Sequence, residues 1–570
     1  MVPEFPKFKD KYVVRHLPGQ GVFLFSESGN FLVGGANVEA VAPLLNGHFA
    51  RDEIAQWLSL AQSRADTFST LASLHQQGHL EEQHQLALDP CHRAFWSELG
   101  VNPTIAARQL ARTKLGVVRF GAVDTSLHLE NILASLGFQI STEPNFIIAL
   151  TDDYKHPGIE QLNHYCIAQR IPWLLIKSTG INLWVGPLFG PGAACWQCLR
   201  DRLKRNREFE NYVERERPLD PPVTLSRARA NFLEQQAIGM AVTQLLRFLA
   251  EGRSPLYSRI LVIETLALNF SFHSVVKRPQ CSACGDPTKF VSNKPVCLSA
   301  VAVIANADGG VRARTAEETF AAYSHHVSPI TGVVSGIHSI ASVGPIHVYS
   351  AGHNFALKND SLYFLQDSLR VNSSGKGRTA SQAMTSALCE ALERYSGLFS
   401  GEEERFRSSF RSIGSKAIHP NDCMLYSDRQ YAERETWLAR NSRFQVVPFE
   451  FDESAEMDWS PVFSLSGGGV RYLPTCYLYY GHPEQNGRFS AWADSNGCAA
   501  GSTREDAILQ GMLELVERDA VAVWWYNRVE RPALDLASFS DPLWIELQNY
   551  YSSIGREFWV IDLTSTQNQS

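Results

Sequence analysis

Apolar and polar residues alternate along the first ninety residues in patterns typical of a small α+β unit. Short runs suited to β-strands are Tyr12–Val14, Val22–Phe25 and Phe31–Val33, and Ser28-Gly29-Asn30 is a hairpin turn signal. Helical patterns follow over Val38–Leu45, Arg51–Leu60 and Thr67–Gln76, and the glycines Gly47 and Gly78 stop the first and the last. Strands with three short helices predict a winged-helix-like unit over residues 1–90.

This unit is open to more than one function. Winged helices often bind DNA, but this one is not notably basic. Its strands could instead pair with an extended peptide by edge addition. A packing domain with no ligand of its own remains a third possibility, because exposed strand edges are usually covered.

The pattern over residues 91–295 changes to continuous apolar runs with helical patterns between them. The runs are Leu115–Phe120, Phe146–Leu150 and Trp173–Ile176, and the helical patterns are Leu127–Leu136, Pro157–Gln169 and a long polar one over Thr224–Leu249. Buried strands alternating with helices predict an α/β domain with a largely parallel sheet.

A nucleotide site is not expected in this α/β domain. The first strand is followed by Phe120–Ser126, in which Gly121 is the only glycine, whereas the phosphate turn needs Gly-x-Gly-x-x-Gly. Asp152 and Asp153 follow the next strand, but two adjacent acids point apart, so a solvated loop is predicted there.

Residues 296–570 predict a mixed α+β domain. A helix is expected over Glu317–Tyr323 and a turn over Ser328–Gly332. Further strands are expected at Val333-Val334, Ile346–Tyr349, Leu362–Phe364, Val446–Phe449, Tyr472–Thr475, Cys476–Tyr479 and Phe558–Leu563.

Two stretches of this last domain repeat one layout. Asn372–Gly397 opens with a Gly-Lys-Gly turn and closes a helical pattern with Glu390, Glu393 and Arg394. Aligning Gly377 with Gly501 also aligns Thr379 with Thr503, and it places Glu514, Glu517 and Arg518 opposite the first Glu-x-x-Glu-Arg, in a helix continuing to Tyr526. Carboxylates three residues apart share one helix face. We therefore expect two matching glycine-turn-to-helix units.

Four carboxylates on two helices repel one another unless a cation lies between them. Oxygen ligands suit Mg²⁺, which is commonly shared between carboxylates and phosphate oxygens. Arg394 and Arg518 could meet a phosphate, and the backbone N–H groups around Lys376, Asn496 and Ser502 form an anion site near helix N-termini. The duplication predicts a nucleoside triphosphate site that is not a Walker loop. Either Glu-x-x-Glu-Arg taken alone would be a solvated helix face.

Cysteine spacing predicts a structural metal site elsewhere. Cys195 and Cys198 form one Cys-x-x-Cys pair, and Cys281 and Cys284 form another, far along the chain. Two such pairs brought together by the fold make a closed four-thiolate site of the kind that holds Zn²⁺. Redox-active dithiols or isolated cysteines are the alternative.

Composition argues against nucleic-acid and membrane partners and indicates the cellular compartment. The net charge of −7 does not suggest a nucleic-acid partner. No apolar run approaches the ~20 residues that span a bilayer, and the N-terminal residues lack the plan of a signal peptide. Scattered cysteines without an export signal favour a reduced, cytoplasmic protein with no membrane partner.

The two Glu-x-x-Glu-Arg stretches resemble the signature motifs of the YcaO family, whose members activate backbone amides with ATP. The quoted motifs are SGKGRT…SALCEALERYS and SNGCAAGST…GMLELVERDA. Residues 1–90 and 91–295 resemble the peptide-binding winged-helix element and the ThiF-like, adenylating-enzyme-like zinc domain that precede the YcaO domain in azoline heterocyclases. CWQC and CSAC match that domain's structural zinc site.

The resemblance implies residue roles and a reaction. Mg²⁺ would be held by Glu390, Glu393, Glu514 and Glu517, and ATP would be contacted by Ser386, Ser502 and Arg518. The N-terminal strands would bind the leader of a ribosomally made precursor peptide. The chain would cyclise Cys, Ser or Thr to a thiazoline or oxazoline, and a homodimer is expected.

Two departures from the family pattern are present. Ser502 stands where Asn is common, and a serine still donates and accepts a hydrogen bond. The chain also stops at Ser570, earlier than family members do, so a C-terminally truncated YcaO domain is expected. The alternatives are an inactive scaffold that binds a precursor peptide and presents it to partner enzymes, or a winged-helix DNA-binding regulator.

Overall fold

The computed structural model describes residues 2–83, 89–123, 128–218, 225–286, 288, 296–305, 311–355, 372–440, 445–485 and 488–564. The chain folds into two compact units. The first contains Met1–Gly158, Tyr165–Gly192 and Ser226–Phe270, and the second contains Ile159–His164, Ala193–Leu225 and Ser271–Ser570. No helix among the described residues is long and apolar enough to cross a membrane.

The N-terminal part of the first unit has the elements that the sequence pattern predicts. Strands β2 (Val13–Leu17), β3 (Gly21–Ser26) and β4 (Gly29–Val33) form an antiparallel sheet. Its other elements are α1 (Ala36–Val41), α2 (Arg51–Trp57), α3 (Arg64–Gln76), and the pair β1 (Pro6–Phe8) and β5 (Leu80–Glu82). Val22, Leu24, Ile54 and Leu71 are fully buried between sheet and helices. The winged-helix assignment itself stays a prediction.

A seven-stranded sheet follows, in the order β12-β11-β10-β9-β8-β6-β7. The strands are β6 (Lys114–Phe120), β7 (Gln139–Ile140), β8 (Phe146–Thr151), β9 (Trp173–Lys177), β10 (Asn182–Phe189), β11 (Arg259–Glu264) and β12 (Asn269–Ser274). Pairs β6–β7, β6–β8 and β8–β9 are parallel, whereas β9–β10 and β10–β11 are antiparallel. The prediction of a parallel α/β core is confirmed, but it missed the antiparallel strands.

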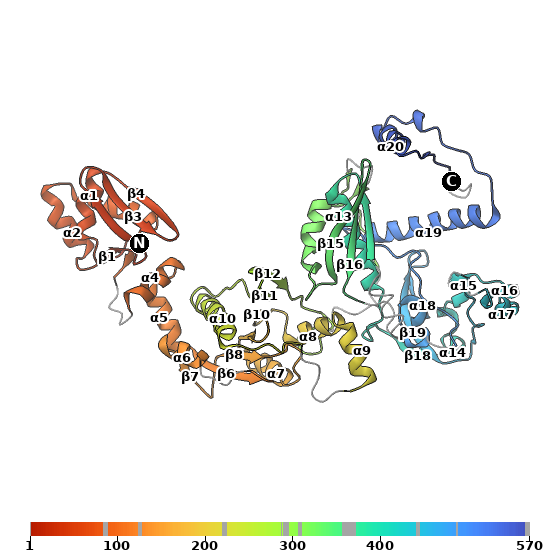
Figure 1. The fold of residues 1–570 in the computed structure, drawn as a ribbon, viewed down its shortest axis with the longest axis horizontal. Helices are drawn as coiled ribbons and strands as arrows, with labels where there is room; N and C mark the ends of the chain where they lie inside the picture. The colour runs from red at the N-terminus through yellow and green to blue at the C-terminus, as the bar shows by residue number, and fades with distance from the viewer. Residues whose placement is uncertain are drawn as a thin grey trace. The chain divides into compact units, whose positions relative to one another are not determined.

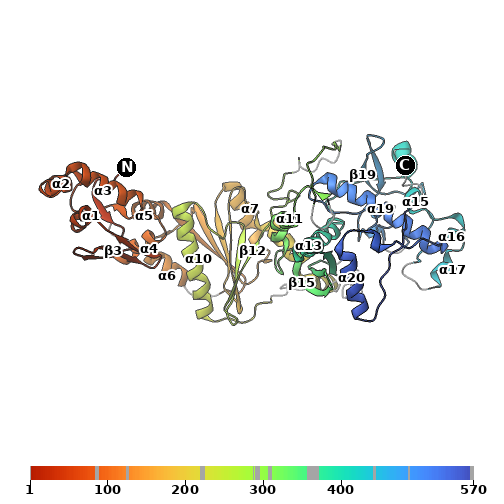
Figure 2. The same ribbon diagram turned by 90° about the horizontal axis from the view of Figure 1, so that it is seen from above.

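Four helices share one core of buried residues with this sheet: α4 (Pro90–Glu98), α5 (Pro103–Arg112), α6 (His128–Ser135) and α10 (Asn231–Glu251). Helix α7 (Ile159–Gln169) lies between β8 and β9 along the chain. Ile238, Ala241 and Leu245 of α10 are buried in the core together with Leu115 and Ile148 of the strands. Figure 2 shows α10 standing against the strands.

Two expectations for this region need correction. Asp152 and Asp153 do not lie in a solvated loop: they are 6% and 8% exposed. The carboxylate of Asp152 accepts the Ala122 N–H at 2.7 Å, and that of Asp153 accepts the Lys155 N–H at 2.7 Å, so backbone amides satisfy both acids. The long helix begins at Asn231, after an irregular segment. Residues 124–127 and 219–224 lie outside the described residues.

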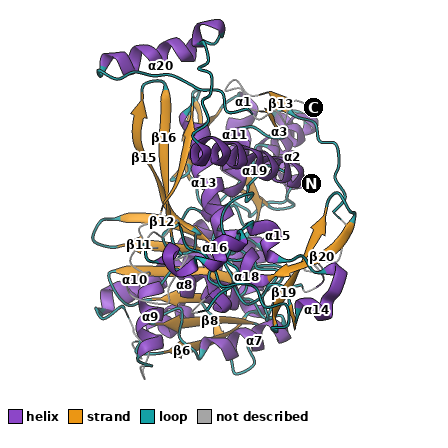
Figure 3. Cartoon of the chain, turned by 90° about the vertical axis from the view of Figure 1, so that its right-hand side faces the viewer, coloured by secondary structure: helices purple, strands orange, loops and turns teal. Residues whose placement is uncertain are grey.

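The second unit contains a helix-on-sheet layer that carries the first repeat. Strands β15 (Val334–Val343), β16 (Ile346–His353) and β17 (Asn372–Gly377) form an antiparallel sheet, and α13 (Ala380–Ser396) packs on it. Figure 1 and Figure 3 show α13 beside β15 and β16. Ala387, Leu388 and Ala391 of α13 are buried against Val334 and Ala351.

The remaining elements of the second unit are shorter, apart from the helix of the second repeat. They are α8 (Trp196–Arg205), α9 (Glu208–Glu216), β13 (Ile304–Ala305), β14 (Val311–Arg312), α11 (Ala316–Tyr323), β18 (Phe406–Ser408), α14 (Phe410–Ile413), α15 (Pro420–Met424), α16 (Asp428–Ala432), α17 (Arg434–Leu438), β19 (Met457–Ser464), β20 (Gly469–Pro474), α18 (Thr475–Leu478), α19 (Arg504–Asn527) and α20 (Pro542–Ser553). Strands β18, β19 and β20 form a second antiparallel sheet.

Several local predictions for this unit are wrong. Gly375-Lys376-Gly377 is not a turn but the end of β17, because it pairs with His347–Tyr349 of β16. The run Cys476–Tyr479 lies mostly in helix α18, and Val446–Phe449 forms no regular element. Phe558–Leu563 makes a single bridge, from Ile561 to Ala533, rather than a strand. The strand expected at Leu362–Phe364 lies outside the described residues.

Candidate functional site on two matched helices

Helices α13 and α19 begin in the same way. The side-chain oxygen of Thr379 caps α13 by accepting the Gln382 N–H at 3.2 Å, and that of Thr503 caps α19 by accepting the Asp506 N–H at 3.1 Å. Both threonines thereby satisfy one of the amide groups left unpaired at a helix start. The pairing of Thr379 with Thr503 in the sequence alignment therefore corresponds to equivalent structural positions.

Glycines bring the preceding backbone close to each helix. A Cβ atom added to Gly375 would lie 1.9 Å from the Ala383 oxygen of α13, and one added to Gly501 would lie 2.3 Å from the Ala507 nitrogen of α19. No side chain fits at these distances, so the close approach requires glycine. The glycines thus permit tight packing on the helix starts, although the first lies in a strand rather than in a turn.

A cavity of about 610 Å³ lies within the second unit and is lined from both helices. Eight of the predicted site residues line it: Lys376, Ser386, Glu390, Glu393, Arg394, Ser502, Glu514 and Arg518. Two predicted residues, Asn496 and Glu517, are exposed and do not line it. The structure therefore brings most of the predicted site to one cavity.

The first carboxylates of the two motifs make matching contacts. Glu390 accepts the Ser374 N–H at 3.2 Å, and Glu514 accepts the Gly497 N–H at 3.1 Å, so each takes an amide from the segment before its own helix. Each also pairs with the arginine four residues on, Glu390 with Arg394 at 3.6 Å and Glu514 with Arg518 at 3.1 Å. The two motifs are equivalent in geometry as well as in sequence.

The electrostatics of Glu393 support a cation site. Burial is the main cause that raises the pKa of Glu393 to about 7; the carboxylates of Glu390 and Glu514 act in the same direction, and Arg394 opposes them. An acid whose ionisation is opposed by burial and by two other acids is the arrangement that a divalent cation stabilises. Carboxylates from both helices thus line one cavity, but they are not among the described groups whose ligand atoms all lie within 4.8 Å of one another.

Basic residues supply the complementary part of the cavity. Arg312, Arg314, Lys376, Arg394 and Arg518 line it together with polar residues of both helices. Guanidinium groups bind phosphate bidentately, so carboxylates and arginines together can hold a metal-bound polyphosphate. Sequence reasoning missed Arg312 and Arg314. Their signal was present in Val311-Arg312-Ala313-Arg314, where two arginines alternate in an extended segment.

The two Cys-x-x-Cys pairs meet, as predicted. The sulfur atoms of Cys195, Cys198, Cys281 and Cys284 all lie within 4.8 Å of one another, and three of these residues are buried. Cys195 Sγ is 3.6 Å from Cys281 Sγ, and Cys198 Sγ is 3.5 Å from Cys284 Sγ. Cys195 is the residue before α8, so that pair sits at a helix start, and the Arg278 N–H points to Cys198 Sγ at 3.4 Å.

The cluster has the chemistry of a metal site. Hydrogen bonds from neighbouring thiols lower the pKa of Cys281, and those from Cys195 and Cys198 lower the pKa of Cys284 to about 7, whereas the same contacts raise the pKa of Cys195. Four thiols this close cannot all ionise unless a cation balances them. Four sulfur ligands could hold Zn²⁺ in a closed tetrahedral site.

Comparisons with known proteins agree with this geometry. Residues 374–568 match the family model described as YcaO cyclodehydratase, ATP- and Mg²⁺-binding. A solved structure described as a heterocyclase in complex with substrate and cofactor is 36% identical, with a TM-score of 0.89, over 99% of this chain and 76% of that one. The heterocyclase TruD is 33% identical, with a TM-score of 0.80, over the same shares of the two chains.

Two curated relatives are uncharacterised proteins. One, from Methanothermobacter thermautotrophicus, is 27% identical over 34% of this chain and 44% of its own length. The other, from the tfuA 3' region of Rhizobium leguminosarum bv. trifolii, is 26% identical over 45% of this chain and 54% of its own length. The chain thus spans about half the length of the curated relatives it matches. The expected truncation finds no support in the comparison with the solved heterocyclases, which aligns 99% of the chain.

Proposed function

The chain belongs to the YcaO family, and from this premise we propose that it is an ATP-dependent peptide cyclodehydratase. The observation that carries the proposal is the cavity between α13 and α19, where acids and arginines from two matched motifs converge. A cavity of this composition suits MgATP, and both motifs contribute residues to it. The wide likeness to heterocyclase structures supports the same reaction class.

In the proposed reaction, a Cys thiol of the peptide attacks the carbonyl carbon of the preceding residue. The amide oxygen takes the γ-phosphoryl group of ATP, which releases ADP. Loss of that oxygen as phosphate, together with the thiol and amide protons, leaves a C=N bond and a thiazoline. Ser or Thr would give an oxazoline by the same route. The protein's task is to position the reactants and to neutralise charge.

The proposal assigns roles to the residues of the cavity. Mg²⁺, when bound, neutralises charge on the phosphates, and Glu390, Glu393 and Glu514 would hold it, with Glu517 assigned from the family motif. Arg394, Arg518, Lys376, Ser386 and Ser502 would contact ATP, as would Asn496 from the neighbouring loop. Arg312 and Arg314 add positive charge on the cavity wall. The backbone N–H groups near the two helix starts favour phosphate as well.

The other parts of the chain receive supporting roles in the proposal. The strands of residues 1–90 would bind the leader of a precursor peptide by edge addition. The four-cysteine cluster would hold structural Zn²⁺, since no ligand position is left open for chemistry. Residues 91–295 would be ThiF-like without a nucleotide of their own. A homodimer that works in the cytoplasm, without nucleic acid or membrane, completes the proposal.

Turnover decides whether the proposal is correct. The full chain is incubated with MgATP and a Cys-containing precursor peptide encoded near its gene. Mass spectrometry should show the loss of one water per modified residue, with one phosphate released for each ring. Peptide binding without either product would refute the enzyme and favour the peptide-presenting scaffold.

A further inference from the structure

A second cavity, of about 500 Å³, lies within the second unit and shares no residue with the first. Its walls come from α8 and α9, from the end of α13, and from the loop after α13. Arg394 at the end of α13 lines the first cavity, and the adjacent Tyr395 lines the second. The last turn of α13 therefore contributes to the walls of both cavities. A ligand of the second cavity would therefore lie close to the proposed reaction site.

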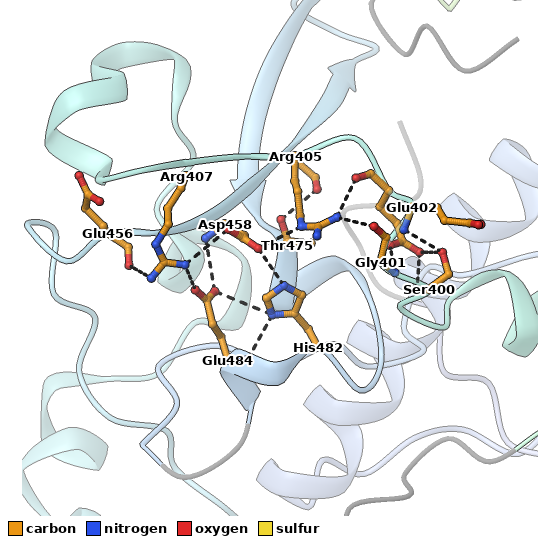
Figure 4. Close-up of polar contacts among 12 residues, drawn as sticks. Ser400, Gly401, Glu402, Arg405, Arg407, Glu456, Asp458, Thr475, His482 and Glu484 are labelled. Carbon is orange, nitrogen blue, oxygen red and sulfur yellow. Dashed lines mark hydrogen bonds and ion pairs between the residues drawn. The ribbon is translucent and has the colours of Figure 1, made fainter. Parts of the chain in front are cut away.

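The loop wall of this cavity is fixed before any ligand binds. The Ser400 N–H and hydroxyl donate to Glu403 at 2.7 and 2.6 Å, and the Gly401 N–H donates to the same carboxylate at 2.8 Å. The Arg405 guanidinium donates to the Gly401 carbonyl oxygen at 3.0 Å and to the Asp458 carboxylate at 3.1 Å (Figure 4). The cavity rim is thus part of an ion-pair network and is preorganised.

The same network holds the adjoining segment of the wall, which contains Tyr480 and Gly481 and is bridged to the loop after α13 through Leu398 and Tyr480. The next residue, His482, is buried, and its ring lies 3.4 Å from the Asp458 carboxylate and 3.8 Å from that of Glu484. Arg407 contacts both acids, at 3.5 and 3.1 Å (Figure 4). Two chain segments that line the cavity are therefore tied to one cluster of charges.

Aromatic rings face this space, and its wall carries three basic and three acidic side chains; Arg202, which contacts the wall residue Tyr395, adds a fourth base. Phe355, Tyr395, Phe399 and Tyr480 line the cavity. Arg202 of α8 donates to the Tyr395 hydroxyl at 3.0 Å and lies over its ring, 4.7 Å from the ring centre. Among the described residues no carboxylate pairs with Arg202, and Lys204 and Arg205 have no ion pair either. A partly buried guanidinium without an acid favours a nearby anion.

The acids of the cavity do not supply that anion. Asp201 and Glu402 both line it, and both pair with the single guanidinium of Arg278. Glu208 also lines it and is engaged in contacts of its own. Because the Tyr395 oxygen accepts from Arg202, the hydroxyl is polarised and its own proton can be donated to an anion in the cavity.

We propose that this second cavity binds a carboxylate carried next to an aromatic or apolar side chain, with Tyr395 donating to it and Arg202, Lys204 and Arg205 supplying the charge. This inference rests on the proposed function: the carboxylate belongs to the peptide substrate, either in an acidic side chain or at the chain terminus. The cavity would then hold one part of the peptide while another part reacts beside α13.

The test measures binding of three short peptides to the full chain by isothermal titration calorimetry without ATP. They are N-acetyl-Gly-Tyr-Gly amide, N-acetyl-Gly-Tyr-Asp amide and N-acetyl-Gly-Tyr-Gly with a free carboxyl terminus. At least one acidic peptide should bind about tenfold more tightly than the neutral amide, the effect of one charge-assisted hydrogen bond. Which acidic peptide binds identifies the source of the carboxylate.

Variants locate the effect. Arg202→Gln should remove the preference for the acidic peptide. If that variant folds poorly, a double variant, Lys204→Gln with Arg205→Gln, takes its place and should reduce the preference. Arg429→Gln, a change at an 82% exposed side chain on α16, should leave it intact. Equal binding of all three peptides, no binding, or a preference that survives these changes would overturn the proposal. Because no turnover is measured, loss of heterocycle formation would count against the proposed function alone.

Discussion

Glu393 is the residue whose surroundings most strongly indicate a bound cation. Glu393→Gln, Glu390→Gln and Glu514→Gln should each lower ATP turnover with peptide by about a hundredfold or more, because each removes one charge from the set that would hold Mg²⁺. Steady-state phosphate release measures the effect, and calorimetry should show that peptide binding survives.

Glu517 provides the comparison within the same motif. It is exposed and does not line the cavity, although the family motif assigns it to Mg²⁺. If Glu517→Gln lowers turnover as much as Glu514→Gln, all four carboxylates act together. Unchanged turnover in Glu517→Gln would restrict the ligand set to the three that line the cavity.

His353 makes stability depend on pH. Its ring is buried in β16 and stacks on Phe355 at 4.4 Å, and Nε2 lies 2.9 Å from the Ser373 hydroxyl. Burial lowers the pKa of His353 from 6.5 to about 4. Because the unfolded chain then binds more protons between these values, stability is complete above about pH 6.5 and is lost as pH falls to 4, by on the order of 3 kcal/mol.

Denaturant titration of the chain at pH 7.5 and pH 5 checks this expectation. His353→Gln removes the titrating group, so the variant should lose less stability over that interval than the parent chain does. An equal loss in both chains would show that other groups, such as His326, whose pKa burial also lowers to about 4, carry the pH dependence instead.

At the level of elements, the two helices depend on their caps. Thr379→Ala and Thr503→Ala should each destabilise the second unit by about 1 kcal/mol, because each leaves a helix-start amide without its acceptor. Thr→Ser at the same positions keeps the oxygen and should cost much less. Urea denaturation followed by circular dichroism measures the difference, and equal losses for Ala and Ser would show that the methyl group, not the cap, matters.

Helical repeats were predictable from sequence because their signals are local. Capping threonines, apolar spacing and glycines lie within a few residues of the helices they define. Strand assignments failed where distant pairing decides: Gly375-Lys376-Gly377 reads as a turn but extends along β16. The composition around Tyr477 predicts a strand. These residues instead form helix α18, which begins directly after Pro474, the last paired residue of β20.

The candidate site shows the same division. The acids and Arg394 were found because the motif repeats, whereas Arg312 and Arg314 lie far from it in sequence and reach the cavity only through the fold. Likewise, the sequence predicts that Asp152 is a surface acid, and only the structure reveals that its carboxylate accepts a hydrogen bond from the Ala122 amide. Position in sequence predicts chemistry well when the partners are local or repeated, and poorly when a single distant contact defines the role.

At the level of the whole molecule, the four-cysteine cluster joins segments that are far apart in the sequence. Its two pairs lie at the start of α8 and in the turn around Cys281, and both belong to the second unit. Closing so long a loop through one metal ion should stabilise that unit, since the ion binds the folded arrangement and not the separated pairs. Metal analysis of the purified chain should therefore find about one zinc per chain.

Removing the metal should lower the thermal stability of the chain, although none of the four cysteines lines the MgATP cavity. Cys198→Ser should abolish bound zinc and lower the melting temperature, and a strong chelator should do the same to the parent chain. Cys423→Ser, which changes an exposed thiol outside the cluster, is the matched control and should retain the metal. If Cys198→Ser keeps both its zinc and its melting temperature, the cluster is not a structural metal site, and the dithiol interpretation would replace it.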